Sequence, residues 1–140
     1  MILRKNHSKT TCLLLIEHDA EFLLRMVDAV AQDDQLVLAA AVSLGAAAIQ
    51  LMALQAPDVL VLDLTRSPKQ AFDVIRHTAA HHPATDMVLI THVGDNASML
   101  ASMEAGAKGR LIHHRAVDRL ARCIHALRTG PACCQTTCAA

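Results

Sequence analysis

The segment LLLIEHD at residues 13–19 decides the fold, because a short and wholly apolar run leads directly into polar residues. The segment PDVLVLD at residues 57–63 repeats this arrangement and ends on Asp63. Short continuous runs of Val, Leu and Ile are typical of strands that are buried on both faces of a parallel sheet. Both segments therefore predict buried strands that carry acidic side chains at their carboxyl ends.

The remainder of the chain alternates similar apolar runs with longer amphipathic stretches. The runs predict strands at residues 12–16, 36–40, 59–62, 87–91 and 109–112. Apolar residues at helical spacing predict helices at residues 22–30, 46–54, 97–105 and 117–127, with a further helix beginning at Phe72. This alternation predicts an α/β fold in which helices cover both faces of a five-stranded parallel sheet, the doubly wound arrangement.

Composition limits the class of protein. The chain has 140 residues, of which 53% are hydrophobic and 19% charged, so we expect one folded domain with a real core. Its 13 Lys and Arg residues balance 13 Asp and Glu residues, so the positive excess that drives binding to nucleic-acid phosphates is missing. With Phe 2, Trp 0 and Tyr 0, the chain also has few rings on which bases could stack. We therefore expect no direct contact with nucleic acid.

The apolar runs also bear on membranes and location. The longest of them fall well short of the roughly 18 residues that suggest a membrane span. The first nine residues are basic and lead into polar residues, unlike a secretory signal. We therefore expect a cytoplasmic protein without membrane contact.

Polar residues follow the carboxyl ends of several predicted strands. Glu17 and His18 follow the first strand, Asp63 follows the third, Thr91 ends the fourth and His113 follows the fifth. These ends meet at one edge of a parallel sheet, where folds of this class place their chemistry. Two carboxylates, a hydroxyl and a cationisable nitrogen are the groups that an acidic phosphoacceptor with a divalent metal needs.

These segments, in this order, resemble the receiver domain of two-component response regulators. The resemblance is carried by residues 13–19, by residues 57–64, by VLITH at 88–92 and by EAGAKGRLI at 104–112. The later part of the chain is most similar to the receivers of LuxR/NarL-type regulators. The resemblance implies a flavodoxin-like sheet with strand order 2-1-3-4-5 and a phosphorelay signalling module rather than an enzyme.

The resemblance also implies the division of the chain into parts. Residues 12–130 match the receiver domain. Residues 1–11 are then an N-terminal extension, and residues 131–140 a flexible Cys-rich tail.

The roles of the site residues follow from the same resemblance. It implies that Asp63 accepts a phosphoryl group, which Thr91 and His113 stabilise. It also implies that Glu17, Asp63 and the backbone carbonyl of Thr65 hold Mg²⁺.

The chain departs from the family pattern at His18, His113 and Arg110. His18 stands where the family has a second acid, and imidazole is a poor ligand for Mg²⁺, so we expect Mg²⁺ binding to be weak or lost, with Mn²⁺ as an alternative. His18 is then a remnant of a degenerate site, a ligand for a softer metal such as Mn²⁺ or Zn²⁺, or a cation that takes over the electrostatic role of Mg²⁺. His113 stands where the family has a lysine, and Arg110 where it has a switching aromatic residue.

Two functional hypotheses remain open on the sequence. In the first, a sensor histidine kinase or a small phosphodonor phosphorylates Asp63, and the domain signals by a change of conformation or dimerisation. In the second, a degenerate receiver acts as a phosphorylation-independent protein interaction module. A homodimer is compatible with both, because Arg119, Arg122 and Arg128 on the last predicted helix could pair with acidic residues of a second copy.

A separate group of histidines lies in the third predicted helix. His77 and His81 are one helical turn apart, and His82 is adjacent. This spacing permits a metal-binding pair on a helix, although a solvated helix face is the simpler interpretation.

Overall fold

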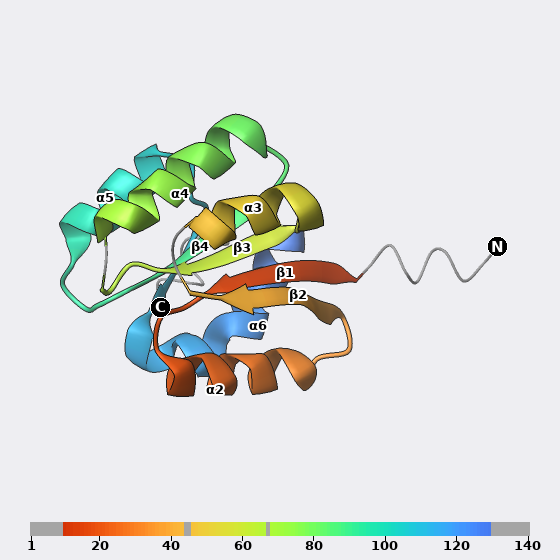
Figure 1. The fold of residues 1–140 in the computed structure, drawn as a ribbon. Coiled ribbons are helices and arrows are strands. Elements are labelled where there is room, and N and C mark those ends of the chain that lie inside the picture. The colour runs from red at the N-terminus through yellow and green to blue at the C-terminus, as the bar shows by residue number, and fades with distance from the viewer. Residues whose placement is uncertain (1–9, 44–45, 67, 130–140) are drawn as a thin grey trace.

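A five-stranded parallel sheet forms the centre of the molecule, in a computed structural model that describes residues 10–43, 46–66 and 68–129 (Figure 1). Each strand pairs in parallel with its neighbours, in the order β2-β1-β3-β4-β5. This is the flavodoxin-like order, so the predicted fold class is confirmed. The strands are β1 (Thr11–Ile16), β2 (Leu36–Val42), β3 (Val59–Asp63), β4 (Asp86–Thr91) and β5 (Gly109–Ile112).

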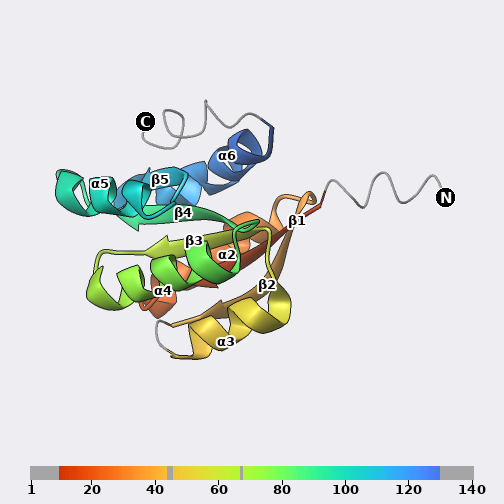
Figure 2. The same ribbon diagram turned by 90° about the horizontal axis from the view of Figure 1, so that it is seen from above.

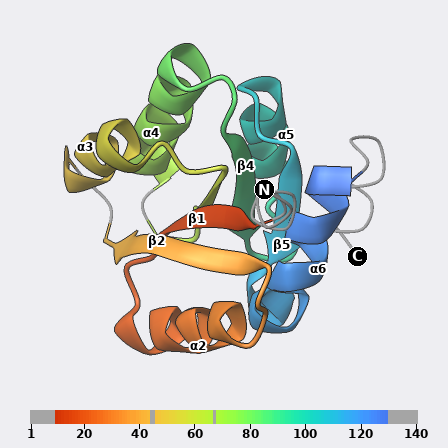
Figure 3. The ribbon, with the colours of Figure 1, turned by 90° about the vertical axis from the view of Figure 1, so that its right-hand side faces the viewer.

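Helices cover both faces of this sheet. Helices α2 and α6 lie on one face, whereas α3, α4 and α5 lie on the other (Figure 3). Figure 2 shows the strands side by side, from β2 near α3 to β5 near α6. The helices are α2 (Ala20–Ala31), α3 (Ala46–Gln55), α4 (Pro68–His81), α5 (Asn96–Glu104) and α6 (Ala116–Thr129), with a short 3-10 helix η1 (His113–Arg115) before the last.

Alternation along the central strands builds the two halves of the core. In β1, Leu13 and Leu15 pack with α2 and α6, whereas Leu14 and Ile16 pack with α3 and α4. Successive strand residues point to opposite faces, and here both faces are covered. Continuous apolar runs are therefore required in the middle of the sheet, which is why these runs predicted the strands.

The observed bounds differ from the predicted ones at a few ends. Strand β1 begins at Thr11, whose N–H donates to the carbonyl of Gln35 at 2.8 Å, so this residue of the predicted extension belongs to the sheet. Strand β2 continues to Val42. Helix α4 begins at Pro68, ahead of Phe72, because proline suits the first helical turn, where no N–H is needed.

Some predicted segments lie outside the described residues. These are residues 1–9 of the extension and the whole Cys-rich tail at residues 131–140. In the part of the chain that the structure describes, no helix has both the length and the apolar character to cross a membrane.

Candidate functional site

Acidic and polar side chains meet at the carboxyl edge of the sheet, as the sequence predicts. Glu17 directly follows β1, Asp63 is the last residue of β3, and Thr91 is the last residue of β4. All three are buried, with exposed fractions of 3%, 3% and 1%. His113 directly follows β5 and is half-buried. The sheet order places β3 between β1 and β4, so Asp63 is the central member of the group.

Asp63 has one carboxylate oxygen held by the backbone and one left without a hydrogen bond. Its Oδ1 accepts a hydrogen bond from the N–H of Thr65 at 2.7 Å, which fixes the orientation of the carboxylate. Its Oδ2 is buried without a hydrogen-bond partner among the described residues. The Nε2 atom of His113 lies 4.0 Å from this Oδ2. Asp63 therefore presents a single oriented oxygen that is available to a ligand or a reacting atom.

Glu17 is the second buried acid, and its environment disfavours the charged form. Its Oε2 accepts a hydrogen bond from the N–H of Asp19 at 3.0 Å and lies 3.5 Å from Nδ1 of His18. Its Oε1 has no hydrogen-bond partner among the described residues. Burial, followed by the proximity of the Asp63 carboxyl, raises the pKa of Glu17 to about 8. In the protein without a cation, Glu17 therefore holds a proton at neutral pH.

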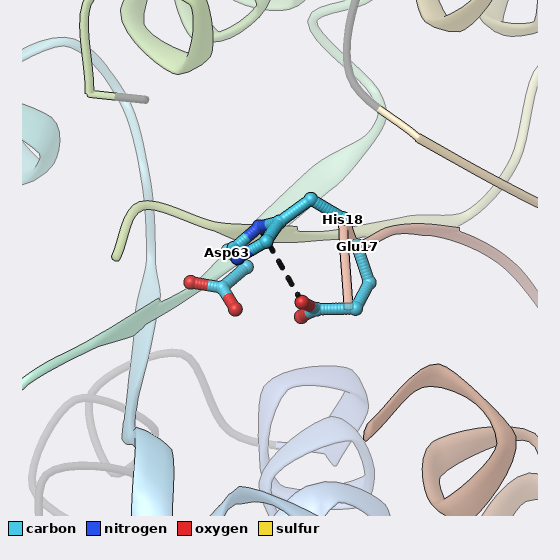
Figure 4. A group of neighbouring side chains, drawn as sticks. All are labelled: Glu17, His18 and Asp63. Carbon is cyan, nitrogen blue, oxygen red and sulfur yellow. Dashed lines mark ion pairs between the residues drawn. The ribbon is translucent and has the colours of Figure 1, made fainter. Parts of the chain in front are cut away.

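Glu17, His18 and Asp63 form a set of side chains that could hold a metal ion (Figure 4). One ligand atom from each residue lies within 4.8 Å of the others. Once Glu17 has released its proton, the two buried oxygens Glu17 Oε1 and Asp63 Oδ2 suit a divalent cation, since a cation would satisfy both of them. The imidazole makes this a mixed oxygen and nitrogen donor set, which suits Mn²⁺ or Zn²⁺ better than Mg²⁺.

Asp19, the third residue after β1, has a structural position. Its side chain caps helix α2 by accepting hydrogen bonds from the N–H groups of Glu21 at 2.9 Å and Phe22 at 3.1 Å. The geometry assigns it to the cap, which holds the start of α2 beside the site.

Thr65 is half-buried and lies two residues beyond the end of β3. Its N–H already bonds to Asp63, so the loop after β3 is tied to the site. The assignment of its carbonyl as a metal ligand stays a prediction.

His113 is held in place by a neighbouring ring. Its imidazole stacks on the ring of Phe22 from α2, with ring centroids 4.2 Å apart and an interplanar angle of 17°. The ring of His92 is a second neighbour at 5.7 Å. The sequence predicted His113 at the site but not this stack, because the partner comes from the opposite end of the chain.

Arg110 makes a second contact that the sequence analysis missed. Its Nε donates a hydrogen bond to the hydroxyl of Thr91 at 3.1 Å. The alternation of side chains along β5 could have predicted this contact. Arg110 and Ile112 point to one face of the sheet, and Ile112 pairs with Thr91 on the neighbouring strand. A guanidinium group therefore lies beside the hydroxyl of the site, where the family pattern has an aromatic ring.

Comparisons with known proteins agree with this geometry at the level of the fold. No family model and no curated protein matches the sequence. The structure is similar to the signal receiver domain of the response regulator NarL from Mycobacterium tuberculosis, with a TM-score of 0.78 and 19% identity, covering 87% of this chain and 98% of that one. The chain has the receiver fold.

Two further structures of the receiver fold extend the comparison. A LuxR-family two-component response regulator from an Aurantimonas species has a TM-score of 0.78 and 21% identity, covering 86% of each chain. The RcsB response regulator of Salmonella typhimurium has a TM-score of 0.78 and 16% identity over 87% of this chain. The match spans 61% of the length of that RcsB chain, so the chain described here corresponds to part of it.

Proposed function

We propose that this chain is a two-component receiver that accepts a phosphoryl group on Asp63. The observation that carries the proposal is the buried Asp63 carboxylate, which is oriented through Oδ1 and has Oδ2 without a partner. Glu17, Thr91 and His113 surround it on neighbouring strand ends. Receivers are the proteins whose fold this chain shares, and this edge of the sheet is where such folds place their chemistry.

The reaction needs only one nucleophile. Asp63 Oδ2 attacks the phosphorus atom in line, and a new P–O bond forms as the bond to the leaving group breaks. That bond is P–N in a phosphohistidine of a sensor kinase and P–O in acetyl phosphate. The leaving group departs with the electron pair, and Asp63 becomes an acyl phosphate.

Neighbouring groups would stabilise the added negative charge. The hydroxyl of Thr91 accepts from Arg110, so its own proton remains free for donation to a phosphoryl oxygen. His113 Nε2 lies close to Asp63 Oδ2 and is a second donor. Together they supply hydrogen-bond donors in a buried site, where such donors act most strongly.

A divalent cation would be held by Glu17, Asp63, His18 and the Thr65 carbonyl. When bound, it supplies positive charge for the phosphoryl oxygens. Glu17 must release its proton for such binding, and the raised pKa of Glu17 therefore weakens binding at neutral pH. We expect Mn²⁺ to be preferred over Mg²⁺, because one donor is an imidazole nitrogen.

The alternative is a phosphorylation-independent interaction module with the same fold. His18 at the metal position, the protonated Glu17 and the short His113 in place of a lysine all favour it. In that case Asp63 serves only as a buried acid beside the Thr65 loop.

Incubation with acetyl phosphate, in Mn²⁺ and separately in Mg²⁺, distinguishes the two. We expect intact-mass spectrometry to detect one added phosphoryl group in the wild type and none in Asp63→Asn. Asp73→Asn is the matched control, since Asp73 is an exposed acid on α4. Absence of the adduct with both cations, and with a beryllofluoride probe by NMR, would favour the interaction module.

The proposed partners are a sensor histidine kinase or a small phosphodonor, and a second copy of the chain. Arg128 is less available for a dimer than the sequence predicts, because it pairs with Asp86 at 3.2 Å and lies 3.8 Å from Asp58 within the chain. Arg122, which is exposed on α6, and Arg119, which is half-buried there, remain as candidates. Analytical ultracentrifugation with and without acetyl phosphate tests whether phosphorylation changes the oligomeric state.

A further inference from the structure

A second group of potential metal ligands lies at the C-terminal end of α4. The rings of His77 and His81 face one another with centroids 4.4 Å apart and an interplanar angle of 37°. His82 lies farther away, with its ring centroid 5.9 Å from that of His77. His81 is exposed, whereas His77 and His82 are half-buried, so the group is open to solvent.

This group is distinct from the Asp63 site. A crossover helix runs antiparallel to the strands that it connects, so α4 begins near Asp63 and ends at the opposite edge of the sheet. The chain enters β4 at Asp86, shortly after the histidines, and reaches Thr91 only at the far end of that strand. A ligand of the histidines would therefore not touch the proposed phosphoacceptor.

We propose that His77 and His81 together bind one divalent transition-metal ion, with Zn²⁺ as the first candidate. Residues four apart are neighbours on a helix surface, and the facing rings show that these two side chains do meet. Two Zn–N bonds of about 2.1 Å at the tetrahedral angle place the two nitrogens about 3.4 Å apart. The ring centroids are 4.4 Å apart, and the nitrogens lie off these centroids. Rotation of the two rings can therefore bring one nitrogen of each to this spacing around a shared ion.

The donor set selects the class of ion. Two neutral imidazoles favour Zn²⁺, Ni²⁺ or Cu²⁺ and disfavour Mg²⁺ and Ca²⁺, which need oxygen ligands. Partial burial, with repulsion from His81 and His82, lowers the pKa of His77, so its neutral form predominates at neutral pH. In the described ranges, none of these three side chains has a hydrogen bond or an ion pair.

The site has two protein ligands, and water would complete the coordination. In the described part of the chain, no group of three ligand atoms within 4.8 Å includes His77 or His81. An open, two-ligand site exchanges its ion readily, unlike a structural site with four protein ligands. Its bound ion would link successive turns of α4 and so oppose fraying of the last turn.

Zinc titration of the whole ¹⁵N-labelled protein tests the proposal, because amide shifts identify where the ion binds. We expect ZnCl₂ to shift the amides of the last two turns of α4, separately from any shift at Glu17, His18 and Asp63, and His77→Gln and His81→Gln each to weaken the binding at α4 by about tenfold or more, since each removes one arm of a chelate. His82→Gln is the matched control and should keep the affinity. The variants should keep the wild-type fold without zinc, because His81 is exposed and His77 and His82 are only half-buried.

Three results would overturn the proposal. Shifts confined to residues near Asp63 or to the cysteines would mean that zinc binds elsewhere. Equal loss in His82→Gln and His81→Gln would mean that the pair is wrongly assigned. Unchanged affinity in His81→Gln would mean that the two rings only stack. Each result is independent of whether Asp63 is phosphorylated.

Discussion

Replacement of Glu17 by glutamine should flatten the dependence of stability on pH. In the folded protein Glu17 keeps its proton up to a pH of about 8, whereas the unfolded chain releases it near 4.5. Between these values the folded state binds one more proton than the unfolded state, so the free energy of unfolding falls as pH rises. Below pH 4.5 both states are protonated and the effect is absent, and above about pH 8 the loss is complete.

The magnitude follows from the size of this window. The interval of about 3.5 pH units, at about 1.36 kcal/mol per unit, corresponds to about 5 kcal/mol across the full range. The wild type should therefore lose about 1.4 kcal/mol per pH unit relative to Glu17→Gln between pH 5 and pH 7.5. Glutamine cannot ionise and has a similar shape, so it removes the titration and retains the packing.

Urea unfolding at several pH values, followed by circular dichroism, measures the two curves. A chelator must be present, because a bound cation would favour the ionised carboxylate and hide the effect. Glu104→Gln is the matched control, since Glu104 is exposed and its replacement should leave the wild-type slope unchanged. Parallel curves for the wild type and Glu17→Gln would refute the reasoning that burial and Asp63 hold the proton on Glu17.

Three further predictions concern the frame around the site. Leu60→Ala should lower the free energy of unfolding by about 2–5 kcal/mol in urea titrations, because the side chain is fully buried in β3, whereas Leu100→Ala, at a residue 60% exposed, should change it little. Asp33→Asn should lower the melting temperature at pH 7, because the Asp33 carboxylate forms a hydrogen bond of 2.7 Å with His125 that lowers the pKa of Asp33. The difference in melting temperature between the wild type and this variant should therefore shrink as the pH falls below about 3.8. A difference that stays constant with pH would contradict this. Asp95→Ala should cost about 1 kcal/mol of stability in urea unfolding, because Asp95 caps α5 by accepting from a backbone N–H at 3.2 Å, and an unchanged midpoint would exclude a capping role.

The sequence predicted the sheet well because burial on both faces leaves a strong local signal. The runs at 13–16 and 59–62 are wholly apolar and short, which is typical of parallel strands covered on both faces. The ends of elements were harder to predict. Strand β2 extends past Ala40 through Ala41 and Val42; Ala41 carries little strand preference, and the pairing of both residues with β1 keeps them in the sheet.

The candidate site was predicted as a set of residues but not as a set of contacts. Parallel topology alone brings Glu17, Asp63 and Thr91 to one edge, so their convergence could be inferred. The stack of His113 on Phe22 and the bond from Arg110 to Thr91 depend on rotamers and on packing between distant segments. The raised pKa of Glu17 likewise depends on burial, which a local pattern does not quantify.

The contact between Phe22 and His113 also has a spectroscopic consequence. With Phe 2, Trp 0 and Tyr 0, the chain has almost no intrinsic fluorescence, so ordinary emission cannot follow events at the site. A Phe22→Trp variant would place a single fluorophore against the imidazole that lies beside Asp63. Because a protonated imidazole quenches indole emission, changes of charge at the sheet edge would become visible as changes of light intensity.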